Sequence, residues 1–342
     1  MFGIPYVGSD VCGFMGKTTE ELCLRWQQLG SFHSFFRFSY RLVYGSLSFT
    51  YSNHNADDQP YQDPAVWPTV AAASKKSNEF RYSFLNYLYS LHYRSALYGD
   101  TVIHPLFFDF PNDSITYNIS EEFMWGPSVL VIPVLKQGHI IIKGYIPNDD
   151  FYSIYEYNYG QKVPIGWSDF PAPYTYNTPT FLRGGSIIPR QPPSMTTRDV
   201  RMGAFNLLII SSIKGATGYL YWDDVKMIVE DINTHPHTFI QFYHSIRENQ
   251  SFVDILVGHT GGPSIPKLEY LEIFNFPSRP LKSSFTLNKK PIQVKMNYKK
   301  NKKILKVYFK ELIDFSYKGI IVFFLKCKAF RYCRSTNNIM ES

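Results

Sequence analysis

Two patterns of apolar and polar residues divide this 342-residue chain, and the change between them falls near residue 100. Before it, residues 77–98 carry apolar side chains at helical spacing, in a stripe of Phe80, Phe84, Leu88 and Leu91. Gly99 marks the expected end of that helix. From residue 101 onward, short apolar runs alternate with turn signals, which is typical of a β-sandwich. The chain is therefore expected to begin as α/β and to continue as all-β.

The first 37 residues predict the order strand, loop, helix, strand. The apolar run 2–7 predicts a buried strand that leads into Asp10, and a second apolar run, 32–36, leads into Arg37. This order is the repeating unit of a (β/α)8 barrel, in which functional side chains follow the ends of the strands. Asp10 and Arg37 are therefore the first candidates for a functional site.

The helix between these two residues begins with a capping pattern. Thr18 and Glu21 have the spacing of a capping box, in which the threonine hydroxyl accepts from a free N–H and the glutamate turns back to the cap. Gly30 is expected to end the helix. The predicted buried face of the helix carries Leu22, Trp26 and Leu29.

Several segments of the chain resemble the glycoside hydrolases of family 31, the lysosomal acid α-glucosidase, maltase-glucoamylase and sucrase-isomaltase type. In the N-terminal region they are 8–14 (GSDVCGF), 21–32 (ELCLRWQQLGSF) and 35–37 (FFR). Shorter matches follow at 183–185 (RGG) and 218–224 (GYLYWDD). The resemblance implies the last strands and helices of a (β/α)8 barrel, followed by two C-terminal β-sandwich domains.

The resemblance also suggests domain limits. The end of the barrel is expected at 1–100, a proximal β-sandwich at 101–194, a distal β-sandwich at 195–330 and a disordered tail at 331–342. An aromatic stretch at 38–52 interrupts the family pattern, in which the arginine runs directly into Asn-His-Asn. A true insertion, a retained intron and a splice variant remain open, and a variant or an artefact of the gene model is favoured.

By resemblance, four residues form the substrate-binding side of a sugar pocket, namely Asp10, Phe14, Arg37 and His54. Asp10 would form a bidentate pair with Arg37 that holds both loops in place. Phe14 would be an apolar wall, and His54 would donate a hydrogen bond to a glucose hydroxyl. Two plainer interpretations stay open: backbone groups could satisfy Asp10, and the stretch 38–52 could displace His54.

The catalytic residues of the family have no counterpart in this sequence. Retaining glycosidases need two carboxyl groups at the scissile bond, one as nucleophile and one as acid/base. The family carries them in a W-x-D-M-N-E segment and a G-D-N segment, and the sequence contains neither. Trp167-Ser168-Asp169 resembles the first segment only superficially and falls in the predicted proximal sandwich. Both carboxylates are therefore expected upstream, and no catalytic residue is assigned in this chain.

Two functions follow from the resemblance. The first is retaining hydrolysis of terminal α-linked glucose from maltose-like oligosaccharides or glycogen, with this chain alone inactive. The alternative is a non-catalytic fragment or splice variant that acts at most as a structural or sugar-binding module. Trp125 and Trp222 could stack on sugars, but a place in the sandwich core is favoured for both.

Charge adds little to this interpretation. The net charge of +7 reflects a lysine excess after residue 280, and no basic-aromatic motif indicates nucleic acid. No apolar run reaches the length of a membrane span, no histidine spacing indicates a metal, and no cofactor is implied. The start of the sequence lacks the pattern of a signal peptide. The predicted partner is an α-glucoside: maltose, an oligosaccharide or glycogen.

Cysteines and sequons favour the secretory route. The resemblance implies a disulfide between Cys12 and Cys23, with two buried free thiols as the alternative. Possible glycan acceptors in N-x-S sequons are Asn112, Asn118 and Asn249. The expected location is therefore lysosomal or extracellular. No state is predicted for Cys327 and Cys333, which lie near the C-terminus.

Overall fold

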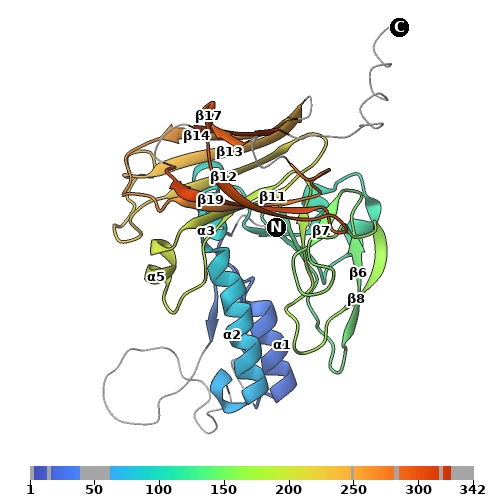
Figure 1. The fold of residues 1–342 in the computed structure, drawn as a ribbon. Helices are drawn as coiled ribbons and strands as arrows, with labels where there is room; N and C mark the ends of the chain where they lie inside the picture. Colours follow the sequence, from blue (N-terminus) through green and yellow to red (C-terminus); the bar gives the residue numbers. More distant parts are fainter. Residues whose placement is uncertain are drawn as a thin grey trace.

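In the computed structural model, two long helices extend from one end of the molecule, and β-sheets make up most of the remainder (Figure 1). The structure describes residues 4–13, 17–38, 62–247, 250–280, 285–315 and 319–324. Helices α1 (Glu20–Gly30) and α2 (Pro68–Ser83) lie side by side at the bottom of the view, in blue and cyan. The described parts of the chain are mostly strands beyond residue 102, and they form no closed barrel.

The N-terminal unit consists of two short parallel strands joined through α1. Strand β1 (Asp10–Val11) pairs in parallel with β2 (Arg37–Phe38), and the register sets Asp10 opposite Arg37. Parallel strands need a crossover connection, and α1 lies in that connection. The structure therefore contains a βαβ unit whose two strands begin with the candidate site residues.

The cap of α1 differs from the predicted capping box. The capping residue is Thr19 rather than Thr18, and its hydroxyl accepts from the Leu22 N–H at 3.3 Å. Glu21 does not turn back to the cap. Its Oε1 instead accepts from the backbone N–H of Gly138, which lies 2.5 Å away in a turn much later in the chain. The N–H of Gly138, which the tertiary fold brings close, thus replaces the N–H of the cap residue as the partner of Glu21.

The prediction of a buried strand over 2–7 is wrong for the described residues. Ile4, Tyr6 and Val7 are 61%, 61% and 49% exposed, and no strand begins before residue 10. Leu22, predicted on the buried face of α1, is also exposed. A barrel strand is covered by neighbours on both sides and both faces, whereas β1 has β2 as its one partner among the described strands. Apolar residues that a barrel would cover therefore stay exposed.

The predicted helix 77–98 is two helices with a break at Phe84. A 3₁₀ turn, η1 (Pro64–Val66), precedes α2, and α3 (Leu85–Tyr98) follows the break. Gly99 ends α3 in the left-handed conformation with φ 74°, as its position in the sequence predicts. The predicted helical segment and its end are therefore confirmed, and its start is earlier than expected.

The apolar stripe of these helices is part of the core. Phe84, Leu88 and Leu91 are buried in one cluster with Trp125 and other side chains of the sheets. The stripe therefore packs into the core, against side chains of a sheet.

A five-stranded antiparallel sheet, here called the first sheet, and a two-stranded sheet follow the helices. Together they are called the first pair of sheets. The larger one has the order β3 (Ile103–His104), β4 (Phe123–Trp125), β5 (Val129–Val131), β9 (Thr180–Arg183) and β7 (Phe151–Ser153). Strands β6 (Ile141–Ile146) and β8 (Gly166–Pro171) form the smaller one, on the right in Figure 1. The short helix α4 (Leu106–Asp109) and the 3₁₀ turn η2 (Ser114–Asn118) connect β3 to β4. A shared apolar core joins both sheets.

Two larger sheets form the other end of the molecule. The first has the order β10 (Ile187–Arg190), β11 (Phe205–Ile210), β15 (Leu268–Phe274), β19 (Ile304–Ile313) and β18 (Val294–Lys299). The second has the order β12 (Ala216–Trp222), β13 (Thr238–Arg247), β14 (Gln250–His259), β20 (Gly319–Phe324), β16 (Phe285–Leu287) and β17 (Lys290–Pro291). Side chains of both sheets share one core cluster. Helix α5 (Thr197–Met202) connects β10 to β11, so β10 lies before the predicted limit at residue 194 and pairs with a strand beyond it.

Candidate functional site

The parallel pair β1–β2 brings Asp10 and Arg37 into contact. The Nε and Nη2 atoms of Arg37 donate to Asp10 Oδ1 at 2.9 and 2.8 Å. The side chain of Asp10 is 13% exposed and that of Arg37 is 41% exposed. The predicted pairing is therefore confirmed, with both recorded bonds on one carboxylate oxygen. A charged pair at adjacent strand ends can offer a ligand an acceptor and a donor at fixed positions.

Close backbone contact holds the segments before these strands together. The Phe35 N–H donates to the Val7 carbonyl at 3.1 Å, and Ser34 Oγ accepts from the Val7 N–H at 2.8 Å. A Cβ atom on Gly8 would lie 1.9 Å from the Phe35 carbonyl oxygen. Position 8 therefore has no room for a side chain unless the backbone moves.

We expect Gly8→Ala to lower the free energy of unfolding by about 1–3 kcal/mol, because the new methyl group must displace the Phe35 carbonyl. Amide hydrogen exchange at Phe35 should accelerate as its bond to Val7 weakens. The matched control is Gly258→Ala in β14, where the nearest atom is 3.7 Å from the added Cβ. Equal effects of the two substitutions on stability and exchange would contradict the proposed close contact.

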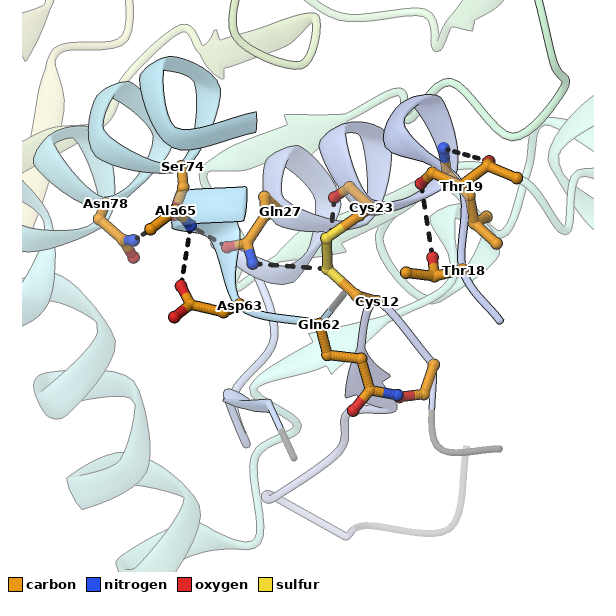
Figure 2. The surroundings of a disulfide bond; sticks show 12 residues. Cys12, Thr18, Thr19, Cys23, Gln27, Gln62, Asp63, Ala65, Ser74 and Asn78 are labelled. Atoms are coloured by element: carbon orange, nitrogen blue, oxygen red, sulfur yellow. Dashed lines mark hydrogen bonds between the residues drawn. A yellow bond between two sulfur atoms is a disulfide. The ribbon is translucent and has the colours of Figure 1, made fainter. Parts of the chain in front are cut away.

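A disulfide ties the loop after β1 to the helix. Cys12 and Cys23 are bonded to each other, and both are buried (Figure 2). Gln27 Nε2 donates to Cys12 Sγ at 3.6 Å, and Gln62 Nε2 donates to the Gly13 carbonyl at 2.7 Å. The predicted pairing is confirmed, and the alternative of two free thiols is wrong. The loop that leaves Asp10 is thus fastened on both sides.

Other predicted residues lie outside the residues that the structure describes. These are Phe14, His54, Asn249, Cys327, Cys333, most of the stretch 38–52 and the tail 331–342. Asn112 and Asn118 are described, and both are exposed. Trp125 and Trp222 are 0% and 3% exposed, which confirms their place in the core.

Arg25 anchors helix α1 to the first pair of sheets. The sequence alone does not predict this role. Its Nη2 donates to the carbonyls of His139 and Ala172 at 2.7 and 2.8 Å. Its guanidinium carbon lies 4.5 Å from the centre of the Tyr174 ring. Burial lowers the pKa of Arg25. The carbonyls satisfy donors that would otherwise lose their hydration.

Arg81 of α2 supports the segment after α1 in the same way. Its Nη1 donates to the Ser31 and His33 carbonyls at 2.8 and 2.7 Å. Burial lowers the pKa of Arg81 to about 10. Burial, reinforced by the charge of Arg81, lowers the pKa of His33 to about 4, so that imidazole is neutral at neutral pH. Arg81 therefore positions the segment that leads to Arg37, and Arg25 holds the preceding helix.

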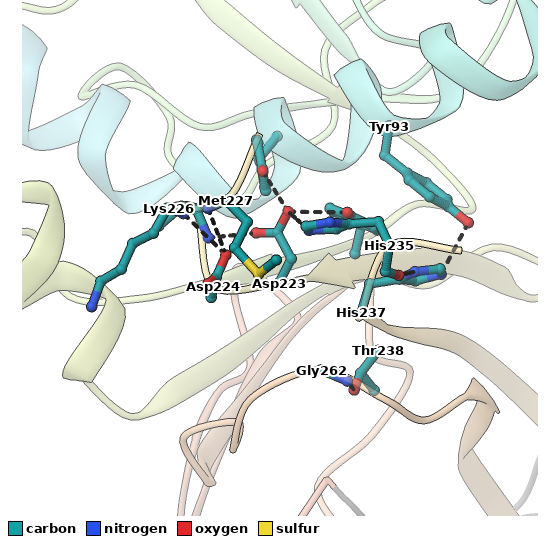
Figure 3. Close-up of polar contacts among 12 residues, drawn as sticks. Tyr93, Asp223, Asp224, Lys226, Met227, His235, His237, Thr238 and Gly262 are labelled. Atoms are coloured by element: carbon teal, nitrogen blue, oxygen red, sulfur yellow. Dashed lines mark hydrogen bonds and ion pairs between the residues drawn. The ribbon is translucent and has the colours of Figure 1, made fainter. Parts of the chain in front are cut away.

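A second polar cluster fastens α3 to β12 (Figure 3). Asp223 is 1% exposed, and its Oδ2 accepts from the Tyr89 and Tyr221 hydroxyls at 2.7 and 3.0 Å. His235 Nε2 lies 3.5 Å from the same oxygen. Burial, together with the bond to Asp223, raises the pKa of Tyr89, so its hydroxyl stays protonated and donates. The two tyrosine hydroxyls satisfy the Asp223 carboxylate, which therefore links α3 to β12. Because the carboxylate is buried, a ligand cannot reach it.

Two further properties, metal binding and membrane spanning, concern the part of the chain that is described. In it, no group of three or more His, Cys, Asp or Glu side chains is placed to hold a metal ion. Nor do the described helices include one with the length and apolar character required to cross a membrane.

A βαβ unit with a carboxylate–guanidinium pair at its strand ends, followed by mainly antiparallel sheets, defines the class as an α/β unit with β-domains. Comparison with known families then identifies the group. The family described as "Glycosyl hydrolases family 31 TIM-barrel domain" matches residues 1–91, and "Glycosyl hydrolase family 31 C-terminal domain" matches residues 99–188. The chain belongs to glycoside hydrolase family 31.

Relatives with assigned names agree. The chain is 37% identical over 230 residues to "Probable alpha/beta-glucosidase agdC" of Aspergillus flavus, covering 66% of this chain and 24% of that protein. It is 36% identical over 250 residues to "Lysosomal alpha-glucosidase" of Rattus norvegicus, again covering 66% and 24%. This chain therefore spans about a quarter of the length of these two relatives.

The fold also agrees with solved structures. A family 31 dextranase of Flavobacterium johnsoniae, solved with isomaltotriose, matches with a TM-score of 0.76 and 19% identity. The match covers 94% of this chain and 40% of that chain. At this level of identity the likeness establishes the fold of the described elements and nothing finer.

Proposed function

We propose that this chain provides the substrate-binding wall of an α-glucosidase-type glycoside hydrolase. The observation that carries the proposal is the in-register contact of Asp10 with Arg37 at two adjacent parallel strand ends. Asp10 would accept a hydrogen bond from a sugar hydroxyl, and Arg37 would hold the carboxylate in place. Phe14 and His54 would complete the wall. Hydrogen bonds to sugar hydroxyls that strengthen in the transition state contribute to glycoside hydrolysis.

In this proposal the chain corresponds to the end of a (β/α)8 barrel (1–100), a proximal β-sandwich (101–194) and a distal β-sandwich (195–330). The family match over 1–91 and 99–188 supports the first two parts. The shared core of the two larger sheets supports the third. The substrates would be α-glucosides with a terminal glucose, such as maltose, oligosaccharides or glycogen, cleaved with retention.

A second candidate function is a structural or sugar-binding module without catalysis. The sequence lacks the two family segments that carry the nucleophile and the acid/base.

A secretory location forms part of the proposal, either the lysosome or the outside of the cell. The Cys12–Cys23 disulfide favours an oxidising compartment. The exposed sequon residues Asn112 and Asn118 are accessible for glycosylation. A relative that carries "lysosomal" in its name is consistent with this route.

The purified chain is expected to hydrolyse neither maltose nor an aryl α-glucoside, because the sequence supplies no nucleophile and acid/base segment. The wall itself is tested in a hybrid enzyme. Residues 8–37 would replace the matching segment of the rat lysosomal α-glucosidase, and hydrolysis of maltose would be measured. The hybrid should be active, and Asp10→Ala within it should lower kcat/KM at least about 100-fold.

The matched control in the hybrid is Thr18→Ala, a change to a partly exposed polar side chain of the same segment that should leave activity unchanged. An Asp10→Ala hybrid as active as its parent would refute the binding role of Asp10. Turnover by the isolated chain that disappears with Asp10→Ala would refute the expectation of inactivity.

A further inference from the structure

A pocket of 390 Å³ lies on the first pair of sheets, between β6, β8 and the segment after η2. Its floor is apolar and consists of Ile132, Pro133 and Ile142. A pocket of this size with an apolar floor and a few polar groups has the general form of a small-molecule site. None of its lining residues belongs to the Asp10–Arg37 site.

Trp167 forms one wall of this pocket and is 50% exposed. The centre of its ring lies 5.3 Å from that of Tyr145 and 5.6 Å from Lys143 Nζ. These contacts hold the indole in place while half of its surface stays open to solvent. A pyranose ring has an apolar C–H face, and a fixed, exposed indole offers a matching flat surface.

Unpaired polar groups line the opposite side. The side chains of Asn118, Ser120 and Glu121 are exposed at the pocket, and none is hydrogen-bonded to another described residue. An amide, a hydroxyl and a carboxylate together provide both donors and acceptors. Such a mixture suits the alternating hydroxyl groups of a sugar better than it suits a purely anionic or cationic ligand.

Glu122 supplies an independent indication of a ligand. The residue is 5% exposed and lines the pocket, and its Oε1 accepts from the Tyr145 N–H at 2.7 Å. Its Oε2 is buried and has no hydrogen-bond partner among the described residues. Burial raises the pKa of Glu122 to about 8, so the neutral acid can both donate and accept at neutral pH. A buried polar atom without a partner calls for one, and a ligand hydroxyl would provide it once the carboxyl group turns toward the pocket.

We propose that this pocket binds one pyranose ring of an oligosaccharide. The apolar face of the ring packs on Trp167, and its hydroxyl groups bond to Asn118, Glu121 and Glu122. The sugar has two possible sources: a free α-glucoside, or the first sugars of a glycan attached to Asn118, which begins a sequon. The proposal does not depend on hydrolysis, because its test measures binding alone.

The test uses the full 342-residue chain, produced in bacteria that add no glycans. The indole Nε1–H signal of Trp167 is followed by ¹⁵N NMR and assigned with Trp167→Phe. Maltotriose and N,N′-diacetylchitobiose are titrated separately, each to on the order of 10 mM. The Trp167 signal should shift with at least one sugar. Trp167→Ala lacks this signal, so its binding is followed through the backbone N–H of the pocket residue Lys143, and it should be at least about tenfold weaker. The response should persist in Asp10→Ala, which separates this pocket from the proposed wall.

The two sugars distinguish the two sources. A response to maltotriose supports a free α-glucoside, and a response to diacetylchitobiose alone supports a glycan on Asn118. Glu121→Ala, at an exposed position, provides a second variant that should weaken binding if Trp167→Ala does not fold. Ile141→Ala, an exposed change on β6 outside the pocket, should leave binding unchanged. No shift with either sugar, or equal binding by wild type and both pocket variants, would overturn the proposal.

Discussion

Replacing Glu272 with alanine is expected to lower the free energy of unfolding by about 3–5 kcal/mol. Glu272 is 1% exposed on β15, and its two oxygens lie 2.8 Å from Arg190 Nη2 and 3.0 Å from Lys306 Nζ. Arg190 also donates to Asn206 Oδ1 at 2.9 Å. The network thus crosses β10, β11, β15 and β19 within one sheet. Loss of the carboxylate leaves two cations without their counterion, one of them deeply buried. Urea denaturation would measure the change.

The effect of Glu272 should also depend on pH. Burial by itself would raise the pKa of Glu272, but the charges of Arg190 and Lys306 outweigh it and hold the pKa below the ordinary value of 4.5. A carboxyl with a depressed pKa stabilises the folded state fully above the unfolded pKa and loses that contribution as the pH falls below it. The advantage of wild type over Glu272→Gln should therefore be constant above about pH 5 and shrink towards lower pH.

The control for Glu272 is Glu269→Ala on the same strand, a partly exposed carboxylate that should change stability by no more than about 0.5 kcal/mol. Equal losses for the two alanine variants would show that the ionic network contributes nothing specific. A Glu272→Ala variant as stable as wild type would mean that the four strands are held by their apolar core alone.

The parts of the site that the sequence predicts share one property: they are encoded by residues close together in the chain. Asp10 and Arg37 are 27 residues apart, and Cys12 and Cys23 are 11 apart. The resemblance to family 31 predicts both pairs, and strand and helix periodicity places only the elements that carry them. The same local pattern wrongly predicts that Ile4 and Leu22 are buried. Apolar residues show that a segment can be buried, but they do not show which neighbouring segments cover it.

The buried charges could not be predicted, because their partners are remote in sequence. Arg25 donates to a carbonyl 147 residues away, Asp223 accepts from a hydroxyl 134 residues away, and Glu272 pairs with a cation 82 residues away. Hydrophobic patterning treats each of these residues as polar and therefore exposed. Only the packing of helices against sheets and the order of strands within a sheet show that these residues are buried and which partners satisfy them.

The second large effect is expected at Trp125, where alanine should cost about 3–5 kcal/mol. Trp125 is 0% exposed on β4, and its ring meets Phe32 and Tyr87 edge-on at 5.5 and 5.8 Å between centroids. It joins the segment after α1 and the helix α3 to the first sheet. Removal of the indole would leave a cavity at this junction. Unfolding in urea, followed by circular dichroism, would show a lower midpoint.

Trp125→Phe provides the decisive comparison. Trp125 Nε1 is buried with no hydrogen-bond partner among the described residues, so phenylalanine removes an unsatisfied donor while keeping an aromatic ring against Phe32 and Tyr87. The cost should therefore fall to about 1–2 kcal/mol. If phenylalanine were as destabilising as alanine, the indole N–H would have to be satisfied in solution, and Trp125 would act through that bond. If phenylalanine restores most of the stability, the contribution of Trp125 is packing, and the helices are held to the first sheet by the fit of aromatic rings.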